Sequence, residues 1–487
     1  MRKRYIVLLV LSWVLMGGAY FVDRYLLHVP TVIAYVLSGL AAVMTVLFIL
    51  KSGARKMRIV LPIISALAIL IFIMPGVIMN PYWNSVNYLV NGYDKAQPYD
   101  HMLSSEEAVE DLEVAVKHLK KAHPLLKDGF PQEMQDRYDK VSSELKNASE
   151  ISVSDLNKKI EYIFTYLNDG HTYTLPLYDF HFLKAYYDGA FAKKDIVAVN
   201  GIPMDEILTR AKDLYSYEME SWELVMVRDQ LVTLEGLVYM GFDTEKVTYT
   251  VEADGEEKDL TYTAADFVTS DKLEIKSSGE ENEFVRYSID DEHSLALMVL
   301  DKCIDDETYE DTLKSMFTEV RDKGIKNVAV DIRNNGGGSD AVVGAFFRYL
   351  DIDSYNMMGV TMRRGPFVFE FANSDPVKND RIDELTFKGD VYLLTSPSSF
   401  SSAMIFAQYV KDNHLGTLVG EAPGNDANGN GDIVCYTLPN SGILVSVSTK
   451  HWLRADRNNP SGVVEPDIEC DSTFALDRLY EILEEKK

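Results

Sequence analysis

The sequence predicts an α/β protein that begins with three transmembrane helices. Two observations lead to this fold class. Long apolar stretches fill the first 80 residues, and residues 281–487 alternate short apolar strands with amphipathic helices, as α/β folds do. The parts expected along the chain are a membrane domain at 1–80, a linker at 81–100, a helical subdomain at 101–179, a β-rich insert at 180–280 and an α/β core at 281–487.

Three apolar stretches predict the membrane helices, at 5–20, 31–50 and 59–79. The second and third contain no charged residue and are long enough to cross about 30 Å of hydrocarbon. The first follows basic residues as a signal peptide does, but no small-x-small cleavage motif ends it, so we expect it to be retained. A buried hairpin of the protein core is the alternative, which three such runs in one short segment disfavour.

The basic residues predict how these helices are oriented. They precede the first helix and lie between the second and third, whereas the loop after the first helix holds one basic and one acidic residue. The positive-inside rule then places the N-terminus in the cytoplasm and the chain after residue 80 outside it, as a multi-pass protein of the cell membrane that contacts the lipid bilayer through residues 1–80. The residues concerned are Arg2, Lys3, Arg4, Asp23, Arg24, Lys51, Arg55, Lys56 and Arg58.

The remainder of the chain is strongly acidic. The formal net charge is −27, although the first 80 residues carry an excess of basic groups. A body of this charge repels phosphate, which excludes nucleic acid as a partner. The cysteines Cys303, Cys435 and Cys470 have no CxxC or CxxH spacing, so neither a structural zinc site nor a disulfide scaffold is expected.

The helical subdomain is expected to begin at Ser104. Ser104 and Glu107 have the spacing of a capping box, and the helix should end at His123, which precedes a proline. Further helical patterns lie near 132–148 and 153–167. The insert that follows should contain a hairpin, with strands at 247–251 and 260–263 around Asp254-Gly255.

The α/β core contains two chemically unusual junctions between a strand and a helix, the places where open α/β sheets bind ligands. The first, residues 331–338, ends in three glycines but lacks the lysine of a phosphate-binding loop. The second, residues 395–404, is rich in serine, a residue that usually serves there as a helix cap. Core strands are expected at 295–300, 327–332, 391–395 and 417–420, and helices at 306–322, 341–350 and 402–410.

Together with the turn Asp169-Gly170-His171-Thr172, these junctions resemble the tail-specific, or C-terminal processing, serine peptidases, particularly the branch similar to the tricorn protease core. Residues 331–338 match the family's Asp-Leu-Arg-x-Asn-x-Gly-Gly signature. Residues 400–404 match its nucleophile motif, with Met404 where glutamate is usual. The resemblance covers about 100–480, excludes the apolar stretches and implies a ClpP/crotonase-like core; no PDZ module is evident.

The resemblance implies roles for five residues. Ser401 becomes the nucleophile, and the backbone N–H of Ser402 becomes one donor of the oxyanion hole. The N–H of Gly337 or Gly338 becomes the second donor, since a side chain there would block the substrate carbonyl. The base departs from the best-known members, because no lysine occurs between residues 411 and 450. The tricorn-like branch uses a histidine instead, and the matching turn makes His171 the base.

Some choices stay open at this stage. His451 and His414 are weaker candidates for the base. The group that orients the imidazole falls among Asp456, Asn458 and Asn459. The expected function is therefore a membrane-anchored serine endopeptidase that cleaves extracytoplasmic polypeptides without cofactor or metal, with its oligomeric state open. The alternative is a catalytically inactive relative that binds peptide or cell-envelope ligands.

Overall fold

The computed structural model describes residues 97–176, 179–253, 255–273, 284–365 and 367–486, with scattered positions between 7 and 47. It corrects the fold prediction in one respect: among these residues no helix is both long and apolar enough to cross a membrane. Apolar length alone predicted the three transmembrane helices, but the helical positions described at 7–18 and 36–47 do not make up a helix of spanning length. The third predicted helix, at 59–79, and most of the linker lie outside the described residues. The orientation and the location outside the cytoplasm stay predictions.

The helical subdomain forms as its sequence pattern predicts. Its first helix has a capping box, in which the N–H of Ser104 donates to Glu107 Oε2 over 2.8 Å, and it ends at His123 before the proline. The apolar faces of the helices share one core with the strands β19 (Asn430–Thr437) and β20 (Leu444–Leu453). The helices are α4 (Ser105–Ala122), α5 (Gln132–Asn147) and α6 (Val153–Phe164).

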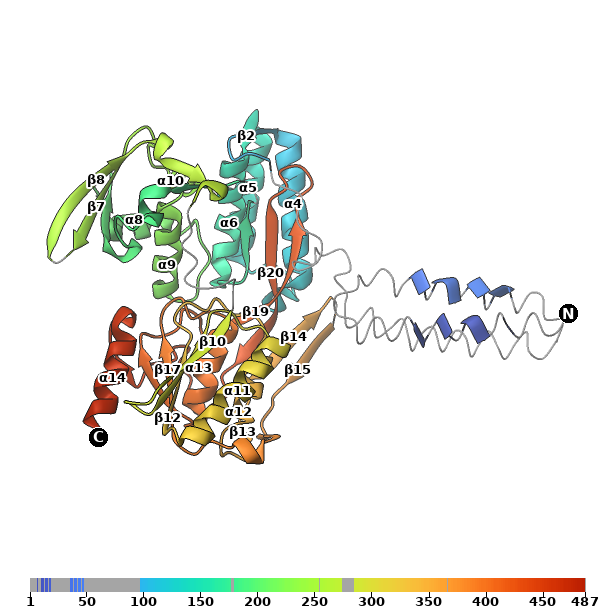
Figure 1. The fold of residues 1–487 in the computed structure, drawn as a ribbon. Helices are drawn as coiled ribbons and strands as arrows, with labels where there is room; N and C mark the ends of the chain where they lie inside the picture. Colours follow the sequence, from blue (N-terminus) through green and yellow to red (C-terminus); the bar gives the residue numbers. More distant parts are fainter. Residues whose placement is uncertain are drawn as a thin grey trace, which may run out of the picture.

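The insert contains the predicted hairpin, which pairs Val247 with Tyr262. It also contains the helices α7 to α10, which the sequence analysis did not assign, and these pack on the hairpin through a core of their own. Figure 1 shows the insert beside the helical subdomain, with α9 directed toward the α/β core. The elements are β4 (His181–Leu183), α7 (Lys184–Tyr187), β5 (Ile196–Val199), β6 (Ile202–Pro203), α8 (Met204–Ala211), α9 (Glu220–Leu231), α10 (Leu234–Tyr239), β7 (Val247–Ala253), β8 (Glu256–Tyr262) and β9 (Phe267–Thr269).

The α/β core is a six-stranded sheet in the order β10-β11-β12-β17-β18-β21, parallel except for β10. Successive residues of β17 point to opposite faces: Leu393 faces the core that contains residues of α11, α12 and α13, and Leu394 faces α14. The strands are β10 (Val285–Asp290), β11 (Leu295–Leu300), β12 (Asn327–Asp331), β17 (Asp390–Thr395), β18 (Thr417–Gly420) and β21 (Ile468–Glu469), and the helices are α11 (Glu307–Lys323), α12 (Ala341–Phe347), α13 (Ser402–Asp412) and α14 (Ala475–Glu485).

A second sheet joins the core to the helical subdomain. Its long strands β19 and β20 extend from the core along α4 (Figure 1). The short strand that follows His171 pairs with β20 and so attaches the turn of His171 to this sheet. The strands are β3 (Tyr173–Leu175), β14 (Gly359–Arg364), β15 (Phe367–Phe371), β19 (Asn430–Thr437) and β20 (Leu444–Leu453); separate short pairs are β1 (Met102–Ser104) with β2 (Glu150–Ser152) and β13 (Ser354–Tyr355) with β16 (Val377–Lys378).

Candidate active site

The two unusual junctions lie side by side. They follow β12 and β17, which are parallel neighbours with Asp331 opposite Leu394. The carboxyl ends of parallel strands meet at one edge of a sheet, and hydrogen bonds join the junctions there. The N–H of Phe400 donates to the carbonyl of Asn335 over 2.9 Å, and the hydroxyl of Ser399 donates to Ile332 over 2.8 Å. The structure therefore places the two junctions, which the sequence analysis singled out separately, at one edge of the sheet.

Ser401 has the backbone conformation of a strained functional residue. Its φ is 55° and its ψ is −122°, in a region that residues other than glycine rarely adopt. It stands at the N-terminus of α13, yet its side chain caps no helix N–H. The residue is held by its own N–H, which donates to the side-chain oxygen of Asn425. A structural role as helix cap therefore does not account for Ser401.

Glycine is required at two positions opposite Ser401. Gly337 has φ +101°, and a Cβ added there would lie 2.5 Å from Ser401 Cβ. Gly338 has φ +138°, and a Cβ there would collide with the carbonyl oxygen of Cys303. The bare backbone of this loop therefore approaches the serine closely.

The hydrogen bonds of this loop distinguish the two candidate oxyanion donors. The N–H of Gly337 already donates to Asn335 Oδ1 over 2.8 Å. Cys303 forms a short parallel bridge with this loop: its N–H donates to the carbonyl of Gly337, and its carbonyl accepts the N–H of Ser339. The N–H of Gly338 takes no part in these two bonds. This arrangement favours Gly338 over Gly337 as the partner of the Ser402 N–H.

His171 reaches the core because its turn is fastened on both sides. Asp169 accepts hydrogen bonds from the N–H of His171 over 2.9 Å, from Thr172 Oγ1 over 2.6 Å and from His123 Nε2 at 3.0 Å. On the other side, Ser446 of β20 donates to the carbonyl of His171 over 2.8 Å. The Asp-Gly-His-Thr sequence thus encodes a rigid turn that presents the imidazole.

The imidazole of His171 is buried and unsatisfied. Neither ring nitrogen has a hydrogen-bond partner within the described chain. Burial lowers the pKa of His171 below its ordinary value, although the charges of Asp169 and Asp432 oppose this effect. The ring packs against Phe400, the residue before Ser401, with ring centroids 4.8 Å apart. A neutral imidazole with an available lone pair therefore packs against the residue that precedes the candidate nucleophile.

One cavity of about 1270 Å³ contains all of these groups. Its wall includes every site residue that the sequence analysis selected: His171, Gly337, Gly338, Ser401 and Ser402. The structure therefore brings together segments that lie far apart in the sequence. The wall does not include the weaker base candidates His414 and His451.

The three candidates for the imidazole-orienting group lie elsewhere. Asp456 accepts the N–H of Asn458 over 2.9 Å, and Asn459 accepts the N–H of Ser461 over 3.0 Å. These bonds form a local turn, and none of the three residues lines the cavity. The side chains of Asp456 and Asn459 stabilise that turn, and within the described chain none of the three forms a hydrogen bond to a ring nitrogen of His171.

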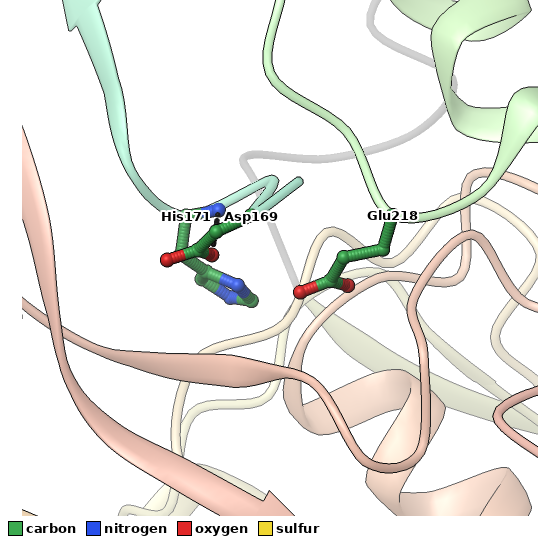
Figure 2. Close-up of side chains that lie close together, drawn as sticks. All are labelled: Asp169, His171 and Glu218. Carbon is green, nitrogen blue, oxygen red and sulfur yellow. Dashed lines mark hydrogen bonds between the residues drawn. The ribbon is translucent and has the colours of Figure 1, made fainter. Parts of the chain in front are cut away.

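Glu218 is the acidic residue that sequence reasoning missed. It belongs to the insert, just before α9, and its carboxylate faces the His171 ring (Figure 2). The ligand-type atoms of Asp169, His171 and Glu218 all lie within 4.8 Å of one another. Burial, followed by the charge of Asp169, raises the pKa of Glu218. No local sequence pattern distinguishes Glu218 from its acidic neighbours, so only the tertiary structure identifies it.

This cluster has the donor types of a metal site, but its oxygens are already used. Asp169 accepts the three bonds described above. Glu218 accepts from Asn425 Nδ2 over 2.7 Å, from the N–H of Asp426 over 3.1 Å and from that of Asn430 over 3.3 Å. Carboxylates that accept this many hydrogen bonds fit a fixed polar network better than a metal centre.

Two departures from the family pattern have clear structural consequences. Asn425 lies in the segment where the best-known members place their lysine, and here it holds both the Ser401 N–H and the Glu218 carboxylate. Met404, where glutamate is usual, is buried and contributes apolar surface to the cavity wall. Neither change removes a group that the Ser401–His171 pair requires.

Comparison with known proteins agrees with this architecture. Residues 295–470 match the family model described as peptidase family S41. Two solved structures have a similar fold: mature CPAF complexed with lactacystin (TM-score 0.54) and a CPAF mutant (TM-score 0.58), each 13% identical in sequence. Each alignment covers 78% of this chain, with 97% of the first structure and 96% of the second. No curated protein matches the sequence.

Proposed function

The α/β core of this chain belongs to peptidase family S41, which makes the protein a serine-type peptidase, and we propose that it is an endopeptidase that acts through Ser401 and His171. The observation that supports this assignment is the shared cavity: a strained serine, a glycine loop with an available N–H and an unpartnered imidazole all line it. These are the parts that acyl transfer requires.

The reaction begins with a proton transfer. A ring nitrogen of His171 takes the proton of the Ser401 hydroxyl as its oxygen attacks the carbonyl carbon of the peptide bond. Catalytic hydrogen bonds are often long without substrate, so a hydrogen bond between Ser401 and His171 is expected to form once a peptide displaces water from the cavity. Because burial lowers the pKa of His171, the ring is neutral and able to accept this proton at neutral pH.

The backbone of the two junctions then stabilises the intermediate. The oxyanion accepts hydrogen bonds from the N–H groups of Ser402 and Gly338, and the N-terminus of α13 adds its positive dipole. His171 returns the proton to the leaving amine, which leaves an acyl group on Ser401. Water, deprotonated by the same imidazole, hydrolyses the ester and restores the serine.

The cavity wall fits a polypeptide substrate. Much of it is aromatic and aliphatic, including Tyr215, Trp222, Trp452 and Ile304. Sites of this kind bury apolar side chains and position the scissile bond with a few polar groups. Apolar residues beside the cleaved bond are therefore expected.

Labelling with a fluorophosphonate probe tests the proposal. The purified full chain should label, Ser401→Ala should not, and His171→Ala should label at least about 100-fold more slowly, the usual contribution of a general base. The matched control is His451→Ala, since His451 is also partly buried but lies outside the cavity wall. Absence of labelling in folded wild-type protein would instead support the inactive, ligand-binding alternative.

A further inference from the structure

We propose that Glu218 is the positioning residue of this active site and that the insert supplies it: its carboxylate holds the His171 imidazole toward Ser401 and balances the charge of the imidazolium that forms during the reaction. This inference rests on the proposed function. It gives the insert a direct part in catalysis and assigns the orienting role that residues 456–459 do not fill.

The position of the carboxylate supports this role. Figure 2 shows the His171 ring between Asp169 and Glu218, with the Glu218 carboxylate directed at the ring. Asp169 is fully engaged by the turn itself, through bonds to the His171 N–H, Thr172 and His123. Of the described acids near the two unpartnered ring nitrogens, Glu218 is one that the turn does not use, and Asp432, whose charge also acts on His171, forms an ion pair with Lys450.

The core fixes Glu218 in place. The Nδ2 group of Asn425 donates to Glu218 over 2.7 Å, and the oxygen of the same amide accepts the Ser401 N–H. One side chain thus sets both the backbone of the nucleophile and the carboxylate beside the base. Such a connection fixes the positions of the serine, the acid and the imidazole relative to one another.

The segment before α9 is also anchored to the turn of His171. Ser216, two residues before Glu218, accepts the N–H of Asp169 over 3.2 Å and donates its own N–H to Glu161 over 3.2 Å. Beyond Glu218, the indole of Trp222 stacks on Phe400, with ring centroids 4.1 Å apart. The carboxylate is therefore held on a segment that contacts both the base and the nucleophile turn.

The charged groups around the site determine how the ionisation of Glu218 can affect the reaction. The charges of Asp169 and Asp432 act on His171, and Lys450 forms an ion pair with Asp432. His123 contacts Asp169, the partly buried His451 lies near both, and Glu161 accepts the Ser216 N–H. Burial raises the pKa of Glu218 to about 8 and lowers that of His171. Below that pH the site therefore favours a neutral carboxyl group beside a neutral imidazole. Once the carboxyl proton leaves, the carboxylate can stabilise the imidazolium, so the titration of Glu218 should set the pH at which activity rises.

The test is the rate of fluorophosphonate labelling of the full chain as a function of pH. In Glu218→Gln the rate on the plateau should fall by about 100-fold, within the range typical of general acid–base effects. The pH of half-maximal labelling should also move down by at least about one unit, because only His171, whose pKa is lowered, then titrates. Glu223→Gln, which replaces a buried carboxylate of α9 outside the cavity wall, should change neither quantity.

The outcomes separate this inference from the function on which it rests. If wild type labels and depends on Ser401 and His171, but Glu218→Gln has the wild-type rate and pH profile, Glu218 has no positioning role. A lower rate with an unshifted profile also overturns the proposal, because a purely structural residue would give it. If wild type does not label, both proposals fail together.

A second variant covers the case in which Glu218→Gln does not fold by circular dichroism. Glu218→Asp keeps a carboxylate but on a side chain shorter by one methylene group. Labelling should therefore slow, while the pH of half-maximal labelling stays near the wild-type value. The proposal would be contradicted if folded Glu218→Asp labelled at the wild-type rate. It would also be contradicted if the pH of half-maximal labelling moved down as expected for Glu218→Gln.

Discussion

The hydroxyl of Ser402 donates a 2.7 Å hydrogen bond to the carbonyl oxygen of Gly338. This bond joins the first residue of α13 to the glycine loop, so the two N–H groups assigned to the oxyanion hole are fixed relative to each other. Preorganised donors of this kind do not need to be reoriented during the reaction, which is the main source of their catalytic effect.

The close approach of the loop gives a first prediction. Gly337→Ala would place a methyl group 2.5 Å from Ser401 Cβ and would force alanine into φ +101°. Because the displaced loop would also move the neighbouring N–H of Gly338, we expect fluorophosphonate labelling to fall by at least about 100-fold, the scale of a lost oxyanion donor. Gly336→Ala is the matched control, because a Cβ there meets nothing within 4 Å. Equal labelling of the two variants would contradict the assigned geometry.

Asn425 gives a second prediction. Asn425→Ala removes the acceptor of the Ser401 N–H and the donor to Glu218 together. The Ser401 N–H then loses the partner that holds it in its positive-φ conformation, so labelling should slow by at least about tenfold, which corresponds to a barrier raised by about 1.4 kcal/mol or more.

The control for Asn425 is Asn440→Ala. Asn440 also carries several hydrogen bonds, but to Glu107, Glu110 and Asp111 on α4, away from the cavity. Its labelling rate should be that of wild type. A rate in Asn425→Ala equal to that of Asn440→Ala would show that the amide does not support the nucleophile.

Several features of the site could be predicted from sequence because their signals are local. The strand-to-glycine junction, the serine at a helix start and the Asp-Gly-His-Thr turn each use residues adjacent in the chain. The alternation of β11, β12, β17 and β18 with helices was equally readable, since apolar runs between turn residues predict buried parallel strands.

Glu218 and the role of Asn425 could not be predicted in this way. Glu218 reaches His171 only because the insert folds over the junctions, and its partner Asn425 lies 207 positions away in the chain. The membrane helices show the opposite failure: hydropathy over a sufficient length predicted them, and the described residues contain no helix of that kind.

A buried ion pair provides a third prediction, on stability. Arg454 follows β20 and binds Asp412 of α13 through bonds of 2.8–3.1 Å, with the two side chains only 2% and 1% exposed. Arg454→Met leaves the carboxylate buried without its partner, so the free energy of unfolding should fall by about 3–5 kcal/mol. Urea denaturation measures this loss.

The control for this prediction is an exposed ion pair. Arg478 and Glu481 lie on α14, with a distance of 2.7 Å and side chains 35% and 63% exposed. Exposed pairs contribute about 0–1 kcal/mol, so Arg478→Met should have little effect on urea denaturation. A similar loss in both variants would mean that the Arg454 pair does not lock α13 to the end of β20.

The stacking of His118 on Tyr436 leads to the last prediction. The ring centroids are 3.6 Å apart, and burial, reinforced by Lys121 and Lys117, lowers the pKa of His118 to about 4. The unfolded chain binds a proton at this histidine near pH 6.5, whereas the folded protein resists it until about pH 4. Stability from the neutral ring is therefore fully present above pH 6.5 and is lost as the pH falls toward 4. Phenylalanine keeps the stacked ring but cannot be protonated, so in His118→Phe the decrease in Tm between pH 6.5 and pH 4 should be smaller than in wild type. His101→Phe, at an exposed position, is the control and should lose Tm as wild type does. An equal decrease in all three proteins would show that protonation of His118 does not contribute to acid unfolding.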